Sequence, residues 1–173
     1  MMHQDEAAFG RLSDARRCWA PRGCRPRVRC SQVREYVYAF AAVSAHDGVL
    51  DSLVLPVANA ETMSLFLAEV ALRHAQEYIL MVVDGAGWHA AEALVVPENM
   101  RLIVQPPYSP ELNPAEHLWE ELREKWFSNR VFDSLGAVED RLAESLRSLE
   151  QTPQLVSSLS GFDWIVSIPL NAN

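Results

Sequence analysis

Residues 78–84 read Y-I-L-M-V-V-D, and residues 107–119 read P-Y-S-P-E-L-N-P-A-E-H-L-W. The first stretch is a continuous apolar run that ends in Asp84, a pattern typical of a strand buried on both faces of a sheet. The second is a Pro-rich loop that opens a helix with Glu116 in its first turn. Acidic side chains at a strand end and a nearby helix start can share a divalent metal ion, which predicts phosphoryl-transfer chemistry on nucleic acid.

The segments around these two stretches predict a mixed α/β fold. Strands are expected over residues 33–45, 49–56, 77–84 and 100–105, and helices over 61–76, 87–95, 113–127, 134–150 and 153–160. Asn59 caps the first helix, whose apolar face is predicted to consist of Met63, Leu65, Phe66, Val70 and Leu72. Antiparallel strands come first and α/β units follow, so we expect a mixed central sheet with helices on its faces, as in the ribonuclease-H-like fold.

Charge is distributed unevenly along the chain. The net charge is −8, but residues 1–35 hold eight arginines against four acidic residues. Residues 15–29 are dense in Pro, Gly and Arg, which predicts turns and short strands. A basic segment on an acidic body can bind phosphates locally, and Arg16, Arg17, Arg22 and Arg25 are the candidate contacts. A solvated surface hairpin is the alternative interpretation.

Length and composition indicate one compact catalytic domain over residues 1–173, with 49% hydrophobic and 22% charged residues. No apolar run approaches the roughly 20 residues that span a bilayer, and the N-terminus has no signal-peptide pattern. Cys18, Cys24 and Cys30 have no partners at zinc-ligand spacing. We therefore expect reduced thiols in a cytoplasmic protein with no membrane partner.

Several motifs together resemble the catalytic domain of the DDE transposases in the mariner superfamily, in particular its bacterial insertion-sequence branch. They are Q-D-E at 4–6, W-A-P-R-G at 19–23, V-V-D-G-A-G-W-H at 82–89 and P-P-Y-S-P-E-L-N-P-A-E-H-L-W at 106–119. The resemblance implies a triad of Asp5, Asp84 and Glu116 that binds two Mg²⁺ or Mn²⁺ ions. It also implies DNA cleavage and strand transfer, with transposon ends and target DNA as partners, and a homodimer located at the bacterial nucleoid.

The chain departs from the family at its start. Full-length members resemble a helix-turn-helix region followed by this domain, whereas here Asp5 is preceded by four residues. We therefore expect a shortened first strand and no helix-turn-helix region. The chain is then either the second reading frame of a split transposase, with a separately encoded DNA-binding half, or a decayed fragment.

Each triad residue also has a structural alternative. Glu116 lies three residues after the expected cap Asn113, as in a capping box. Asp84 precedes a glycine and suits a turn. Glu6 adjoins Asp5, and because side chains alternate along a strand, only one of the two can enter the site.

Other residues receive supporting roles. His89 lies near Asp84 and is a candidate for orienting a metal ligand, or is a structural histidine. Ser109 and Asn113 are expected to shape the loop that orients Glu116, and Trp88, Trp119 and Trp126 to pack in the core. Two further functions remain open: a ribonuclease-H-like nuclease or resolvase, and an inactive fragment that acts as a binding or inhibitory module.

Overall fold

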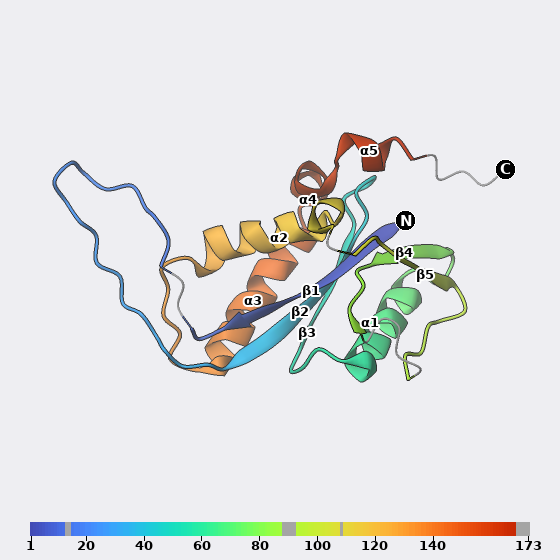
Figure 1. Ribbon diagram of the computed structural model, residues 1–173, viewed down its shortest axis with the longest axis horizontal. Coiled ribbons are helices and arrows are strands. Elements are labelled where there is room, and N and C mark those ends of the chain that lie inside the picture. Colours follow the sequence, from blue (N-terminus) through green and yellow to red (C-terminus); the bar gives the residue numbers. More distant parts are fainter. Residues whose placement is uncertain (13–14, 88–92, 108, 169–173) are drawn as a thin grey trace.

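The computed structural model describes residues 1–12, 15–87, 93–107 and 109–168. They form a five-stranded sheet in the order β3-β2-β1-β4-β5 with helices on both faces (Figure 1). The strands are β1 (Met2–Gly10), β2 (Tyr36–Val43), β3 (Leu50–Leu55), β4 (Ile79–Val83) and β5 (Met100–Val104). The first three strands are antiparallel neighbours, while β4 runs parallel to β1 and β5 parallel to β4. The mixed sheet predicted from the order of the elements is confirmed.

The helices lie close to their predicted positions. They are α1 (Ala60–Arg73), α2 (Ala115–Leu122), α3 (Leu135–Glu150), α4 (Pro153–Ser160) and α5 (Asp163–Val166). A 3₁₀ turn, η2 (Pro110–Leu112), precedes α2, and a π-helical turn, η3 (Arg123–Phe127), continues it. The helix predicted over 87–95 falls largely outside the described residues. No helix in the described part of the chain is long and apolar enough to cross a membrane.

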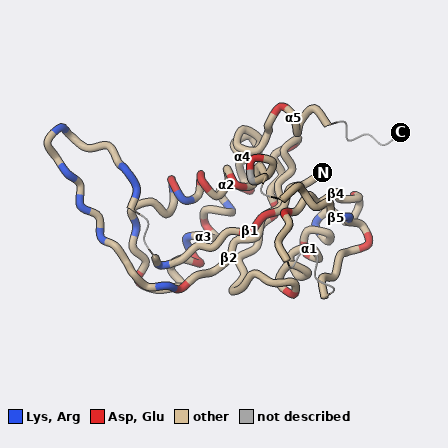
Figure 2. The backbone as a smooth tube through the Cα atoms, viewed as in Figure 1, with Lys and Arg blue, Asp and Glu red and all other residues tan. Residues whose placement is uncertain are grey.

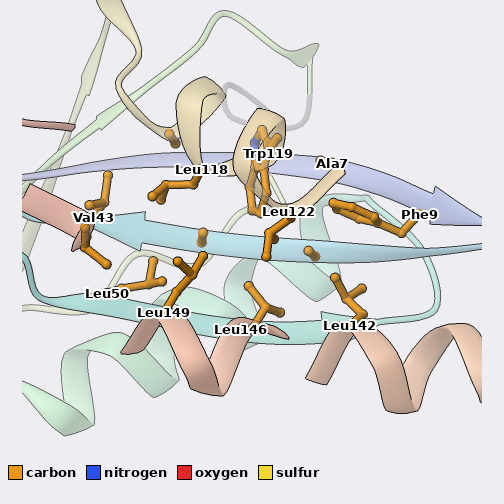
Figure 3. Close-up of a cluster of buried hydrophobic side chains, with 14 of the residues drawn as sticks. Ala7, Phe9, Val43, Leu50, Leu118, Trp119, Leu122, Leu142, Leu146 and Leu149 are labelled. Carbon is orange, nitrogen blue, oxygen red and sulfur yellow. The ribbon is translucent and has the colours of Figure 1, made fainter. Parts of the chain in front are cut away.

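The sheet separates two apolar cores, one on each face. On one face α2, α3 and α4 pack over β1 and β2, and Trp119, Leu142 and Leu146 are almost fully buried there (Figure 3). On the other face α1 covers β2, β4 and β5, with Phe40 and Phe66 in its core. Burial of apolar surface on both sides fixes the register of β1 and β2, because a one-residue slip would exchange the two faces.

Strand β1 differs from the prediction of a shortened first strand. It extends from Met2 to Gly10, well past Asp5, and pairs with β2 from His3 to Gly10. It pairs with β4 through Met2 and His3 alone. The part that precedes Asp5 is therefore short, but the ladder with β2 holds Asp5 in the middle of the strand.

Helix α1 begins as predicted but buries a narrower face. The side chain of Asn59 accepts the backbone N–H of Thr62, and the Thr62 hydroxyl accepts the backbone N–H of Asn59, which forms a capping box. Met63, Phe66 and Val70 are buried, as predicted. Leu65 and Leu72 are instead 56% and 74% exposed, because the sheet covers only one side of the helix.

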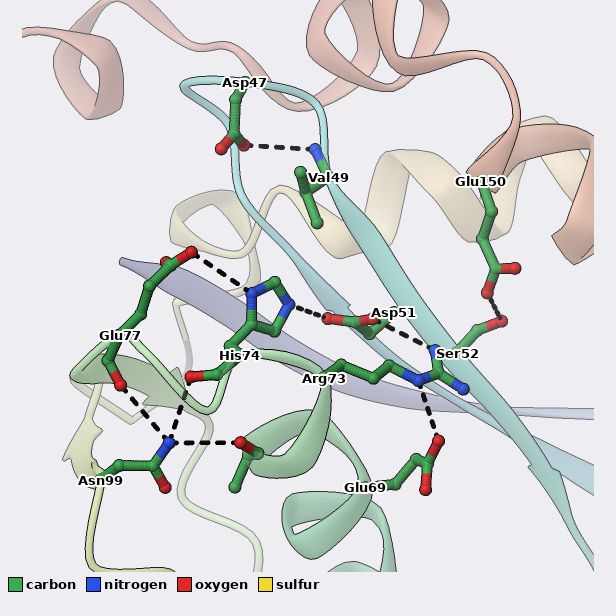
Figure 4. A network of polar contacts seen from close by, with 11 residues as sticks. Asp47, Val49, Asp51, Ser52, Glu69, Arg73, His74, Glu77, Asn99 and Glu150 are labelled. Carbon is green, nitrogen blue, oxygen red and sulfur yellow. Dashed lines mark hydrogen bonds and ion pairs between the residues drawn. The ribbon is translucent and has the colours of Figure 1, made fainter.

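A polar network anchors the end of α1 (Figure 4). The buried carboxylate of Asp51 on β3 lies 2.7 Å from His74 Nε2 and 3.1 Å from Arg73 Nη1. The Asn99 side chain donates to the carbonyls of Ala71, His74 and Glu77 at 3.2 to 3.3 Å. These contacts attach α1 to β3 on one side and to the start of β5 on the other.

The basic segment is a long projecting loop between β1 and β2 (Figures 1 and 2). Residues 15–35 contain no strand, so the short strands predicted for 15–29 are wrong. Nothing in this segment pairs with a neighbouring strand, and without a partner ladder its residues form no strand of their own. Most of its side chains are exposed, including Trp19 and the thiols of Cys18, Cys24 and Cys30.

Two leucines of α1 test the corrected face of this helix. We expect Leu67→Ala to lower the free energy of unfolding by about 2–5 kcal/mol, because Leu67 is fully buried. Leu65→Ala removes the same atoms from an exposed position, so its effect should stay within about 0.5 kcal/mol. Urea denaturation of both variants measures the difference. Equal losses would mean that the α1 surface around Leu65 is covered in solution.

Candidate active site

A cleft of about 430 Å³ lies beside β1, at the C-terminal end of β4. Asp5, Asp84 and Glu116 all line it. Oxygen-bearing side chains of Gln105, Ser109 and Asn113 line it as well. The structure thus brings the three predicted carboxylates together from β1, from the residue after β4 and from the first turn of α2.

The strand register explains why the two aspartates meet. His3 on β1 is level with Val82 on β4, and Asp5 and Asp84 each follow this pair by two residues. Because side chains alternate along a strand, Asp5 and Asp84 lie on the same side of the sheet as His3 and Val82. Hydrogen bonding between the two strands ends at His3, which leaves room for a cleft where they diverge.

Glu116 enters the cleft through the loop that precedes α2. The buried side chain of Asn113 donates from Nδ2 to the Gln4 carbonyl at 3.4 Å and accepts the Ala115 N–H at 3.1 Å. Asn113 therefore orients the helix start, as predicted, although Pro114 occupies the formal cap position. Among the described residues the Glu116 carboxylate makes no capping-box bond to Asn113, and it is exposed at the cleft.

Asp5 has the most unusual environment in the cleft. Its side chain is buried, and Trp119 Nε1 donates a hydrogen bond to its Oδ2 at 2.9 Å. Burial raises the pKa of Asp5 to about 7; the Trp119 hydrogen bond opposes this rise, and the negative charges of Glu116 and Glu6 add to it. The sequence predicted Trp119 as a core residue, and its contact with a cleft carboxylate was not anticipated.

The neighbouring acidic residue points elsewhere. Glu6 is absent from the residues that line the cleft, and its Oε2 accepts a hydrogen bond from Gln4 Nε2 at 2.7 Å. Gln4 and Glu6 share one side of β1 and Asp5 lies on the other, as the alternation of strand side chains requires. The prediction of Asp5 over Glu6 is consistent with this geometry.

Asp84 forms the turn considered for it and also lines the cleft. Its Oδ1 accepts the backbone N–H of Ala86 at 2.8 Å, which shapes the turn after β4. The same carboxylate lines the cleft and is partly exposed there. A carboxylate offers about four acceptor positions, so the turn contact leaves capacity for a ligand.

The donor set fits a hard divalent cation. Mg²⁺ and Mn²⁺ prefer oxygen ligands, and the cleft presents three carboxylates together with amide and hydroxyl oxygens. Within the described residues, no three acidic, His or Cys side chains already stand close enough to hold an ion. Mutual repulsion keeps like charges apart, so a bound cation would have to draw the carboxylates together.

The remaining predicted residues lie away from the cleft or outside the described chain. His89 and Trp88 fall within residues 88–92, outside the described residues. Arg16, Arg17, Arg22 and Arg25 lie on the β1–β2 loop, and Arg16 forms a salt bridge with Glu124 of η3. Trp126 stacks with Arg141, whose guanidinium carbon lies 4.6 Å from the ring centroid. Trp126 thus packs between helices, as predicted.

Comparison with known proteins agrees with this architecture. The family model of the DDE superfamily endonucleases matches residues 1–139. An uncharacterized protein of Sinorhizobium fredii (strain NBRC 101917 / NGR234), y4pE/y4sA, is 34% identical over 131 residues, which cover 75% of this chain and 96% of that protein. The family match makes this chain a nuclease-type enzyme, and it belongs to the DDE superfamily endonucleases.

Solved structures share the fold at low sequence identity. A Mos1 mariner paired-end complex with Mn is 17% identical with a TM-score of 0.63, covering 93% of this chain and 56% of that one. A Mos1 transposase paired-end complex with the left transposon end is 17% identical with a TM-score of 0.60, covering 92% and 55%. The chain thus spans little more than half the length of the Mos1 chains.

Asp5→Asn tests the cost of burying this carboxylate. Because the pKa of Asp5 is raised from 3.8 to about 7, the metal-free folded protein loses stability as the pH rises through this range. We expect Asp5→Asn to be more stable than the wild type at pH 8 by a few kcal/mol, since one pKa unit is about 1.4 kcal/mol. The advantage should vanish below pH 4, where both side chains are neutral.

Calorimetric melting in EDTA between pH 4 and 8 measures this difference. Burial also lowers the pKa of His3, to about 4, but His3 is present in both proteins and cancels in the comparison. Melting temperatures that differ by the same amount at every pH would contradict a raised pKa at Asp5.

Proposed function

We propose that this chain carries out metal-dependent cleavage and strand transfer of DNA, in the manner of a transposase, with Asp5, Asp84 and Glu116 as the catalytic triad. The observation that carries the proposal is the cleft, which is lined by all three carboxylates although they lie far apart in the sequence. Family membership supports the same reaction class. The family motifs and the geometry therefore select the same residues.

The three side chains would act as metal ligands from three different parts of the fold. Asp5 on β1, Asp84 after β4 and Glu116 on α2 line the same cleft and would hold the metal ions. Mg²⁺ or Mn²⁺ held by these carboxylates would supply Lewis-acid chemistry and would activate a water or 3′-hydroxyl for attack at phosphorus. Gln105 lines the same cleft and would contact the DNA strand.

DNA is the proposed partner, and the β1–β2 loop its main electrostatic contact. Residues 15–35 contain seven arginines and one acidic residue, whereas the body of the protein is acidic. The Mos1 paired-end structure contains a transposon end, which makes such ends the proposed DNA for this chain. Pairing of two ends would require a homodimer, and recognition of the ends would be the role of a helix-turn-helix half.

A non-catalytic binding module is the second candidate. The separation of the carboxylates favours this candidate, because no three of them in the described residues lie close enough together to hold a metal ion. Such a chain would bind DNA through the loop and leave it uncut. Equal DNA affinity with and without Mg²⁺, and no cleavage, distinguishes this candidate from an enzyme.

Charge-neutral substitutions in the cleft test the triad. We expect Asp84→Asn and Glu116→Gln each to reduce cleavage of a DNA substrate at least 100-fold, because each removes an anionic ligand while preserving side-chain size. Glu111→Gln changes an exposed carboxylate of the same loop that does not line this cleft, so it should retain wild-type activity. Joining of a 3′-hydroxyl DNA end is scored alongside cleavage to separate strand transfer from hydrolysis.

Metal binding gives an independent measure of the same site. Millimolar Mg²⁺ should raise the melting temperature of the wild type, because the ions bind only the folded protein, and should leave that of Asp84→Asn unchanged. Full activity of either cleft variant would remove that residue from the triad. Absence of both cleavage and a metal-induced shift in the wild type would leave the binding module as the function.

The exposed arginines of the loop test the DNA contact. We expect the double variant Arg22→Gln/Arg25→Gln to bind duplex DNA more weakly at every sequence and to lower the slope of log affinity against log salt by about two. Arg101→Gln removes an exposed arginine from β5, away from the loop, and serves as the control. Identical salt slopes for all three proteins would exclude the loop from phosphate binding.

A further inference from the structure

Trp119 connects the hydrophobic core to the cleft. It lies three residues after Glu116 on α2 and is 1% exposed. Its ring packs edge-on against Phe9, with centroids 6.1 Å apart, and its indole N–H reaches Asp5 Oδ2 at 2.9 Å. Figure 3 shows the side chain extending from α2 into the cluster over β1.

We propose that Trp119 is the positioning residue for Asp5, holding one carboxylate oxygen so that the group faces the cleft in one orientation. The inference rests on the proposed function, because it gives Asp5 the role of a metal ligand. The hydrogen bond has an ionisable acceptor, and such bonds are about twice as strong as neutral ones when the acceptor is charged. A hydrogen-bond donor behind a metal-binding carboxylate fixes the orientation of that carboxylate in the metal-free protein.

Electrostatics make such a restraint necessary. The charges of Glu116 and Glu6 both act on Asp5, and rotation away from Glu116 would relieve that repulsion while taking Asp5 out of the cleft. A donor fixed in the core opposes the rotation, because Trp119 cannot follow without breaking its packing against Phe9. A phenylalanine at this position would fill the core but would leave Asp5 without the restraint.

A second contact keeps α2 aligned with β1. Asn113 donates to the carbonyl of Gln4, the residue before Asp5, and accepts the N–H of Ala115. Asn113, Glu116 and Trp119 are spaced by three residues and lie along one side of the helix start. The segment that carries Glu116 is therefore attached to β1 before and after it, which sets the separation between Glu116 and Asp5.

Removing the indole donor without removing the ring tests this role. Trp119→Phe deletes the N–H, and replacement of Trp119 by benzothienylalanine puts sulfur in place of the N–H within the same bicyclic shape. Trp126→Phe makes the same change in η3, where the ring contacts Arg141 and not Asp5. The readouts are Mn²⁺ affinity of the intact protein without DNA, from the electron paramagnetic resonance of free Mn²⁺, and the Mn²⁺ dependence of cleavage.

We expect both Trp119 variants to bind Mn²⁺ at least about tenfold more weakly, as is typical when a partner that orients a metal ligand is lost. The Mn²⁺ concentration for half-maximal cleavage should rise by the same factor, and the rate at saturating Mn²⁺ should fall less. Trp126→Phe should match the wild type in both readouts. Wild-type Mn²⁺ affinity in the benzothienylalanine protein would overturn the positioning role and leave the proposed triad intact.

Asp5→Asn separates failure of this inference from failure of the proposed function. If Asp5→Asn binds Mn²⁺ and cleaves DNA as the wild type does, or if the wild type binds no Mn²⁺, the triad assignment fails and the role of Trp119 fails with it. If Asp5→Asn loses binding while the Trp119 variants keep it, only the positioning role fails.

A measurement on the unaltered protein avoids any folding defect of the variants. The indole ¹H–¹⁵N resonance of Trp119, assigned from its loss in Trp119→Phe, should shift on addition of Mg²⁺, because the metal withdraws charge from the acceptor carboxylate. The resonance of Trp126 should stay in place. An unmoved Trp119 resonance at a Mg²⁺ concentration that raises the melting temperature would overturn the inference.

Discussion

The site depends on how β1 pairs with its two neighbours. Its ladder with β2 runs from His3 to Gly10, whereas its ladder with β4 ends after Met2 and His3. One side of β1 is therefore fixed along its length, and the other opens at the point where Asp5 and Asp84 become level. A longer ladder with β4 would close the cleft, and a weaker ladder with β2 would leave Asp5 without a rigid support.

This arrangement places a carboxylate where the core would otherwise favour an apolar residue. Asp5 lies on the same side of β1 as Ala7 and Phe9, which are buried in the core beneath α2. An ionised group there loses hydration, and hydrogen bonds from the Trp119 indole and the Glu6 backbone replace only part of it. Residues that oppose the local preference for apolar side chains concentrate at functional sites. A bound cation would stabilise the ionised Asp5 by supplying a positive charge.

Much of this architecture could be predicted from local signals. The apolar run before Asp84, the Asn113-Pro114 helix start and the antiparallel strands that precede them each depend on residues close in sequence. The Trp119–Asp5 bond could not be predicted, because it joins residues 114 positions apart and a buried tryptophan is ordinarily a packing residue.

The predictions that were wrong also depended on contacts between distant parts of the chain. Periodicity located the inner face of α1 but could not give the width of the surface that the sheet covers, so Leu65 and Leu72 were assigned to the core although they are exposed. Residues 15–29 are dense in Pro, Gly and Arg, and short strands there would need a partner ladder, which composition cannot predict.

In the proposed function, the distribution of charge would separate DNA binding from chemistry. The exposed arginines lie on a loop that projects from the body (Figure 2), whereas the cleft is lined by carboxylates that repel phosphate. In the proposed function, loop contacts would gain affinity by displacing counterions from DNA, independently of what occupies the cleft. The cleft can accept a phosphodiester only after cations offset its carboxylates. A chain of this design can therefore lose catalysis through a single cleft residue and still bind DNA, so affinity for DNA cannot by itself distinguish an active transposase from an inhibitory fragment.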